Sequence, residues 1–200
     1  MDTTWYRDIN RFAVQTPWAH EFMKVFAIYG VGVFAVLVLV VWWYARYAPN
    51  APRAVAATAW AAAGTVFAVG INQFIVAAVH RPRPYVTMSG VEVLVSRTHD
   101  FSLPSDHAVT AGAAVAGLWI VAYYGSKAIR RIAIAGTILA LVLAFARVYV
   151  GAHYPSDVLV GLLVGASVVM IGWFALKSVL THLAAFVARQ ALIRPLVIGT

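Results

Sequence analysis

Residues 131–157 read RIAIAGTILALVLAFARVYVGAHYPSD, an apolar run that ends in polar and charged side chains. Only 15 uncharged residues separate Arg131 from Arg147, fewer than the roughly 20 that a spanning helix needs. A spanning helix here must therefore continue through Arg147 toward Gly151, with the guanidinium facing the bundle interior or the outer interface. An arginine, a histidine and an aspartate then lie together at a membrane edge, where unpaired charge is costly.

The composition of the whole chain places it in a bilayer. Of its 200 residues, 62% are hydrophobic and 11% are charged, and the mean hydropathy is +0.82, which is too apolar for a soluble domain. Four other uncharged runs are of spanning length: Lys24 to Arg46 (21 residues), Arg53 to Arg81 (27), His107 to Lys127 (19) and Asp157 to Lys177 (19). A span must satisfy its own backbone hydrogen bonds. We therefore predict one all-α domain over residues 1–200, a polytopic membrane helix bundle with five transmembrane helices at about 24–45, 55–79, 107–124, 131–150 and 156–177.

The two ends of the chain are predicted to lie on the membrane surface. Residues 1–21 mix five charged side chains with tryptophan and phenylalanine, which favours an interfacial helix. The tail after Lys177 suits an amphipathic cytoplasmic helix, and a sixth crossing is the alternative. The first apolar run lacks a basic start and a cleavage site, so we expect it to be retained. The absence of cysteine excludes disulfides and thiolate metal sites.

Five crossings sort the charged residues by side. All seven acids fall on the side that holds residues 1–24, 80–107 and 147–157, whereas the other side has eight bases and no acid. Cytoplasmic loops are enriched in lysine and arginine, so the second side is predicted to be cytoplasmic. Topology thus accounts for the net charge of +8. Because the bases form no stripe with aromatic residues between them, no nucleic-acid partner is expected.

Three polar clusters then lie on the outer side, and the first is the pair of His153 and Asp157. Their i, i+4 spacing beside Pro155 places them at the start of a helix, within reach of each other. If the carboxylate accepts the Nδ1 proton, Nε2 keeps its lone pair and can act as nucleophile or base. The alternative is a purely structural pair at a helix terminus.

The second cluster is Pro104-Ser105-Asp106-His107, which precedes an apolar helix. Ser105 can cap this helix, and the free amides of a first turn attract an oxyanion. His107 could donate a proton to a leaving oxygen. An ordinary capped helix with a histidine at the interface is the alternative.

The third cluster consists of arginines. Arg81, Arg83 and Arg147 offer forked donors that suit phosphoryl oxygens, and the prolines around Arg83 hold it in a stiff extended segment. Arginines at membrane ends also snorkel to headgroups, which is the alternative for Arg81 and Arg147. Because all three clusters fall on one predicted side, we expect a single phosphate site.

These residues resemble the three-part signature of the type 2 phosphatidic acid phosphatase superfamily: Lys-x6-Arg-Pro, Pro-Ser-Gly-His and Ser-Arg-x5-His-x3-Asp. The matching residues are Arg83-Pro84, then Pro104 to His107 with Asp106 in place of glycine, then Arg147, His153 and Asp157 with Ala146 in place of serine. The lysine of the signature falls on Val76, so one phosphate ligand is missing, and Arg81 is the candidate substitute. The pattern looks most like the undecaprenyl pyrophosphate phosphatases of the bacitracin-resistance type.

The resemblance implies a mechanism and a location. His153 would attack phosphorus to form a phosphohistidine, Asp157 would orient it, and His107 would protonate the leaving group. Arg83, Arg147 and Ser105 would hold the phosphoryl oxygens, with Asp106 and Arg81 completing the site. No metal and no other cofactor is expected.

The expected reaction converts undecaprenyl or another polyprenyl diphosphate to the monophosphate plus phosphate. It would take place on the extracytoplasmic side of a bacterial plasma membrane and recycle a carrier lipid for cell-wall synthesis. One alternative is a phosphatase for phosphatidic acid, phosphatidylglycerol phosphate or another lipid phosphate. A more distant alternative is a transporter that binds an anion or a lipid without cleaving it.

Overall fold

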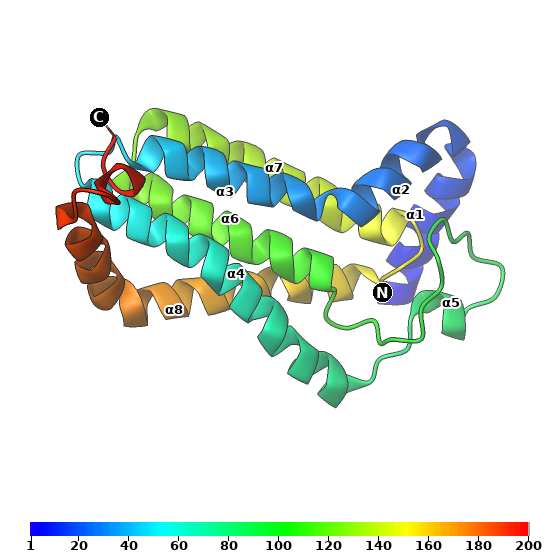
Figure 1. The fold of residues 1–200 in the computed structure, drawn as a ribbon. Coiled ribbons are helices and arrows are strands. Elements are labelled where there is room, and N and C mark those ends of the chain that lie inside the picture. The colour runs from blue at the N-terminus through cyan, green and yellow to red at the C-terminus, as the bar shows by residue number, and fades with distance from the viewer. Residues whose placement is uncertain (200) are drawn as a thin grey trace.

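The protein is a bundle of helices in the computed structural model, which describes residues 1–199 (Figure 1). Within these residues it forms no strand. The elements are α1 (Asp2–Gln15), η1 (Pro17–Ala19), α2 (His20–Tyr29), α3 (Val31–Ala45), α4 (Ala51–Val79), α5 (Pro84–Thr87), α6 (Asp106–Tyr124), α7 (Lys127–Tyr149), α8 (Pro155–Arg189) and η2 (Arg194–Leu196).

Four of the five predicted crossings are confirmed, because Ala51–Thr87, α6, α7 and α8 are long and apolar enough to span a membrane. The bent pair Pro17–Tyr29 and Val31–Ala45 makes a fifth when it is taken as one span. The continuous first helix predicted over 24–45 is wrong in one respect, because the chain bends by 58° at Gly30. A Cβ atom at Gly30 would lie 2.4 Å from the carbonyl oxygen of Phe26, so this break needs a glycine.

The predicted interfacial helix is α1, which lies at the same end of the bundle as α5 (Figure 1). It packs against α7 and α8. Its buried face carries Tyr6, Asn10 and Ala13, whereas Trp5 and Phe12 are exposed. Large apolar side chains on the outer face of an amphipathic helix are typical of a helix at a membrane surface.

The last spanning helix is longer than predicted. α8 has 35 residues, and its final turns bend away from the preceding ones (Figure 1). The chain then returns to the end of α3, where Arg46 donates to the carbonyl of Pro195 at 2.8 Å and accepts from the amide of Gly199 at 2.9 Å. Up to residue 199 the tail therefore makes no sixth crossing.

Small residues allow the central helices to approach closely. α6 packs against α3, α4, α7 and α8. A Cβ atom at Gly165 of α8 would lie 2.0 Å from the carbonyl oxygen of Val109 in α6, and one at Gly117 would lie 2.4 Å from the Cβ of Ala61 in α4. These small residues allow α6 to lie directly against α4 and α8.

Replacing Gly165 by alanine should destabilise the bundle, because α6 and α8 must separate to admit the new methyl group. The expected loss in the free energy of unfolding is about 1–3 kcal/mol. Gly70→Ala in α4 is the matched control, since no atom lies within 4 Å of its Cβ position, and it should be neutral or slightly stabilising. Thermal unfolding in detergent measures both, and equal stability of the two variants would contradict the close contact.

Candidate active site

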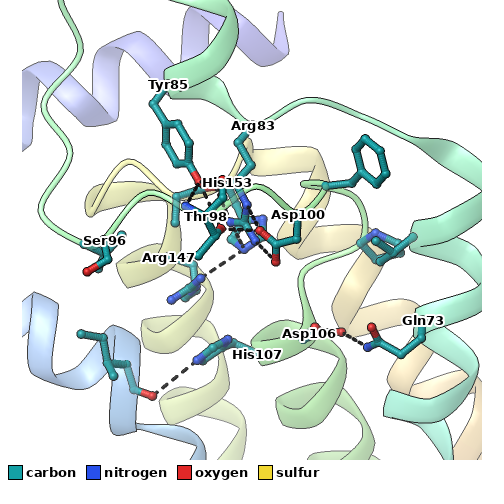
Figure 2. Close-up of a pocket in the computed structure, with 16 residues that line it drawn as sticks. Gln73, Arg83, Tyr85, Ser96, Thr98, Asp100, Asp106, His107, Arg147 and His153 are labelled. Atoms are coloured by element: carbon teal, nitrogen blue, oxygen red, sulfur yellow. Dashed lines mark hydrogen bonds and ion pairs between the residues drawn. The ribbon is translucent and has the colours of Figure 1, made fainter.

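A cavity of about 400 Å³ lies at the end of the bundle that holds α1 and α5. Its wall combines side chains from α4, α6 and α7 with the long loop after α5 and the turn before α8 (Figure 2). The polar side chains in the wall are Gln73, Arg83, Tyr85, Ser96, Thr98, Asp100, Asp106, His107, Arg147 and His153. The structure thus brings residues of all three sequence clusters to one cavity.

The long loop after α5 reaches this site because it is fixed along its length. The side-chain amide of Asn10 in α1 pairs with the backbone of Glu92 through two hydrogen bonds of 2.8 and 3.0 Å. The amide of Leu94 donates to the carbonyl of Val150 at 3.1 Å. Gly151 has a φ of +81° and passes within 2.4 Å of Glu92 at its Cβ position, so a side chain there would push the loop away.

His153 lies at the centre of the site and is only 2% exposed. Its Nδ1 is 2.8 Å from the carbonyl oxygen of Ser102. Because a carbonyl can only accept, Nδ1 carries the proton and Nε2 carries the lone pair. Nε2 faces Nη1 of Arg83 at 3.2 Å and Nη2 of Arg147 at 3.3 Å (Figure 2). A nucleophilic nitrogen therefore lies between two guanidinium groups.

The surroundings of His153 keep it neutral. Burial lowers its pKa to about 4, and the positive charges of Arg147 and Arg83 act in the same direction against the opposing effect of Asp157. The neutral imidazole, which is the form with a free lone pair, therefore predominates at physiological pH.

The predicted hydrogen bond between His153 and Asp157 is not formed. Oδ2 of Asp157 lies 3.8 Å from Nδ1 of His153, and accepts instead from the amide of Tyr154 at 2.8 Å and from the hydroxyl of Ser102. The i, i+4 argument fails because His153 precedes α8, so no helical turn joins the two residues. Asp157 closes a capping box with Tyr154, and Ser102 links the carboxylate to the imidazole.

Arg83 is buried and held from two sides. Its Nε and Nη2 donate to the two oxygens of Asp100 at 3.0 and 2.9 Å, and its Nη1 donates to the carbonyl of Ala152 at 3.0 Å. Burial alone would raise the pKa of Asp100, but the hydrogen bonds and charge of Arg83 outweigh it and lower the pKa below the usual value. The ionised carboxylate therefore orients Arg83 so that Nη1 faces His153.

Arg147 enters the site from the last turn of α7 and is 8% exposed. Its Nη1 donates to the carbonyl of Ala27 at 3.1 Å, and its Nε has no partner among residues 1–199. The snorkelling alternative does not apply, because this guanidinium turns inward. One of its donors remains unpaired beside the cavity.

Only part of the segment 104–107 at the start of α6 reaches the cavity with its polar side chains. His107 lines it and lies with Nε2 3.4 Å from the carbonyl of Ile28. Asp106 also lines it, but its Oδ1 accepts from Asn72 at 2.7 Å and from Gln73 at 2.9 Å. Ser105 does not line the cavity and makes no side-chain cap. Its buried hydroxyl has no hydrogen-bond partner among residues 1–199, and because Ser105 is absent from the cavity wall, the phosphate contact predicted for that hydroxyl is not supported.

The phosphate contact predicted for Arg81 is not supported either. Arg81 is absent from the cavity wall, and its guanidinium donates to Asp2, Ser156 and Asp157, each at 2.6 Å. It points behind Asp157 because three acceptors gather there. Val76, which stands at the place of the missing lysine, lines the cavity.

Two residues that hold Arg83 and His153 in place were missed from the sequence. Asp100 appeared only as one of seven acids on the outer side, and Ser102 had no distinguishing neighbour. A serine two residues and an acid four residues before the motif that starts at Pro104 could have been noted as candidates. Their partners depend on the path of the loop, which no spacing indicates.

The family model of the PAP2 superfamily matches residues 57–180 of the chain. The chain belongs to the PAP2 superfamily. This confirms the resemblance seen in the motifs, and it makes the protein a phosphatase rather than a transporter.

Two proteins of known name resemble this PAP2 chain in sequence. Undecaprenyl-diphosphatase BcrC of Bacillus subtilis is 30% identical over 161 residues, which cover 80% of this chain and 76% of that protein. Lipid A 1-phosphatase of Rhizobium etli is 37% identical over 81 residues, which cover 40% of this chain and 29% of that protein.

Two crystal structures share the PAP2 fold. LpxE of Aquifex aeolicus has a TM-score of 0.62 at 21% identity, covering 86% of this chain and 94% of its own. The first transmembrane PAP2 type phosphatidylglycerolphosphate phosphatase from Bacillus subtilis has a TM-score of 0.65 at 20% identity, covering 88% and 86%. At these identities the likeness shows the arrangement of helices.

The neutral state of His153 can be observed directly. Nitrogen-15 NMR of histidine-labelled protein in detergent should give a titration midpoint near 4 for His153 rather than near 6.5, because its pKa is lowered. On acidification the imidazole should thus stay neutral until the pH nears that midpoint. The resonance of His153 is assigned as the one that is absent from the spectrum of His153→Ala. A titration midpoint near 6.5 would contradict the buried site.

Proposed function

We propose that this PAP2 phosphatase hydrolyses a polyprenyl diphosphate, and that its substrate is undecaprenyl diphosphate. The reaction proceeds through a phosphohistidine at His153. One observation carries the proposal: the lone pair of a buried, neutral imidazole points between the Nη atoms of Arg83 and Arg147. Phosphoryl transfer is accelerated chiefly by positioning and charge stabilisation. The site offers both around one nitrogen.

In the first step, Nε2 of His153 attacks the terminal phosphorus, and the bond to the bridging oxygen breaks. Arg83 and Arg147 hold the non-bridging oxygens, whose charge spreads in the transition state. His107 gives its proton to the leaving lipid monophosphate. In the second step, water attacks the phosphohistidine while His107 accepts a proton, which releases phosphate and restores His153.

The lipid tail has an apolar groove of about 360 Å³ available beside the cavity. It is lined by residues of α3, α4 and α6, including Val31, Phe34, Val66 and Thr110. Val31 and Thr110 lie three residues beyond Ile28 and His107, which line the cavity. The groove thus starts about one helical turn from the cavity, which supports a substrate whose headgroup enters the cavity while its tail stays in the bilayer.

The choice of substrate rests on the relatives. BcrC is named an undecaprenyl-diphosphatase and covers most of the chain, whereas the lipid A 1-phosphatase matches a shorter part. The charge asymmetry supports an extracytoplasmic site in a bacterial plasma membrane. The end of α3 and the starts of α4 and α7 lie at the end of the bundle opposite α5 (Figure 1), and these segments carry Arg46, Arg53 and Lys127.

The purified protein should release phosphate from undecaprenyl diphosphate in detergent with EDTA present. His153→Ala should lower kcat by at least about a thousandfold, because the nucleophile is lost, and should abolish a phosphoenzyme trapped with radiolabelled substrate. His182→Ala, which alters an exposed histidine of α8, is the control. Turnover by His153→Ala at the wild-type rate would refute the nucleophile, and faster hydrolysis of phosphatidic acid or phosphatidylglycerol phosphate at equal surface concentration would refute the substrate.

The orientation can be tested with single cysteines, since the chain has none of its own. A cysteine at Ser89 in the loop after α5 should react with an impermeant maleimide on intact spheroplasts, whereas one at Ser126 between α6 and α7 should react only after lysis. The reverse pattern would contradict an extracytoplasmic site.

A further inference from the structure

The carboxylate of Asp157 is buried at the rear of the site, with no exposed surface. Among residues 1–199, one lysine or arginine forms an ion pair with it, namely Arg81 at 2.6 Å. A buried charge that loses its partner is strongly destabilised, and relaxes by taking up a proton or by moving. Arg81 therefore compensates the charge of Asp157 and holds the carboxylate in place.

Arg81 is itself held by the N-terminal helix. Its Nη2 donates to Asp2 in the first turn of α1 at 2.6 Å, and its guanidinium lies 4.1 Å from the ring centroid of Tyr154. Asp2 also accepts from the amide of Ser156 at 3.0 Å and from its hydroxyl at 2.6 Å. The first turn of α1 is thus tied to the first turn of α8.

The chain of contacts continues to the proposed nucleophile. Asp157 accepts from the hydroxyl of Ser102, and the carbonyl of the same Ser102 accepts the Nδ1 proton of His153. A shift of Asp157 would move Ser102, and with it the acceptor that fixes the tautomer and direction of the imidazole. Neither Asp2 nor Arg81 lines the cavity, so neither needs to touch the substrate to affect the reaction.

We propose that Asp2 and Arg81 are positioning residues, which act through Asp157 and Ser102 to hold Nε2 of His153 in line with the phosphorus. The N-terminal helix then belongs to the catalytic apparatus, although it lies outside residues 57–180 that match the family model. Arg81 acts from behind the nucleophile and does not replace the missing lysine. This inference rests on the proposed role of His153.

The two roles for Arg81 predict different kinetics. A phosphate ligand binds the substrate and inorganic phosphate, so its loss raises KM and weakens inhibition by phosphate. A positioning residue acts on the orientation of the nucleophile, so its loss lowers kcat while KM and inhibition by phosphate stay near the wild-type values. Loss of an outer residue that orients a metal ligand typically costs 10- to 100-fold, and we expect a loss of similar size for the orientation of His153.

The experiment uses the full chain in detergent, with any tag at the C-terminus so that Asp2 keeps its place. Arg81→Gln should lower kcat about 10- to 100-fold, with KM and inhibition by inorganic phosphate changed less than about twofold. Arg81→Lys should recover part of kcat, since it restores the charge, and Asp2→Asn should lower kcat by a smaller factor. Arg11→Gln is the control, because it breaks an exposed ion pair with Asp8 on the same helix, and it should behave as wild type.

The outcomes separate this inference from the proposed function. A folded Arg81→Gln with wild-type kcat would overturn the positioning role, and so would a raised KM with unchanged kcat, while wild-type turnover and the loss in His153→Ala would leave the phosphohistidine intact. If Arg81→Gln does not fold, Asp2→Asn and Arg81→Lys carry the test, and wild-type kcat in both would overturn the proposal. Wild-type protein that hydrolyses none of the lipids would instead refute the function.

Discussion

Charge that is buried near a membrane must be paired, and this constraint shapes the whole end of the bundle around His153. Three charged side chains of the site are largely buried. Arg83 pairs with Asp100, Arg147 donates to a backbone carbonyl, and Asp157 pairs with Arg81. A buried charge without such a partner would destabilise the fold by more free energy than the surrounding packing contributes. The pairs determine where each side chain points, and the directions of those side chains create the site.

The charges in the cavity wall also determine how the cavity attracts an anion. Arg83 and Arg147 bring two positive formal charges to its wall, and Asp100 and Asp106 bring two negative ones, while Val76 supplies none. With balanced charge, attraction over long distances is weak. Capture of a substrate then depends on its lateral diffusion in the membrane and on short contacts with the Nη atoms beside His153.

Much of this architecture could be predicted from the sequence, because bilayer thickness and motif spacing are strong constraints. Run lengths predicted the five crossings, and the motifs predicted that Arg83, His107, Arg147 and His153 would meet. The bend at Gly30 could not be predicted, since the uncharged run of residues 25–45 continues across it. The partners predicted for Asp157, Arg81 and Ser105 were wrong. The actual partners depend on the path of the loop after α5 and on the positions of backbone carbonyls, and the identities of the side chains indicate neither.

The bend at Gly30 has a consequence for the chemistry. In a continuous helix the carbonyls of Ala27 and Ile28 would accept from amides four residues later. Because α2 stops at Tyr29, these two oxygens sit at a helix terminus and are free for other donors. Arg147 bonds to the first, and His107 approaches the second. An interrupted span thus serves as an acceptor platform that anchors a guanidinium and an imidazole, and straightening it would withdraw both anchors at once.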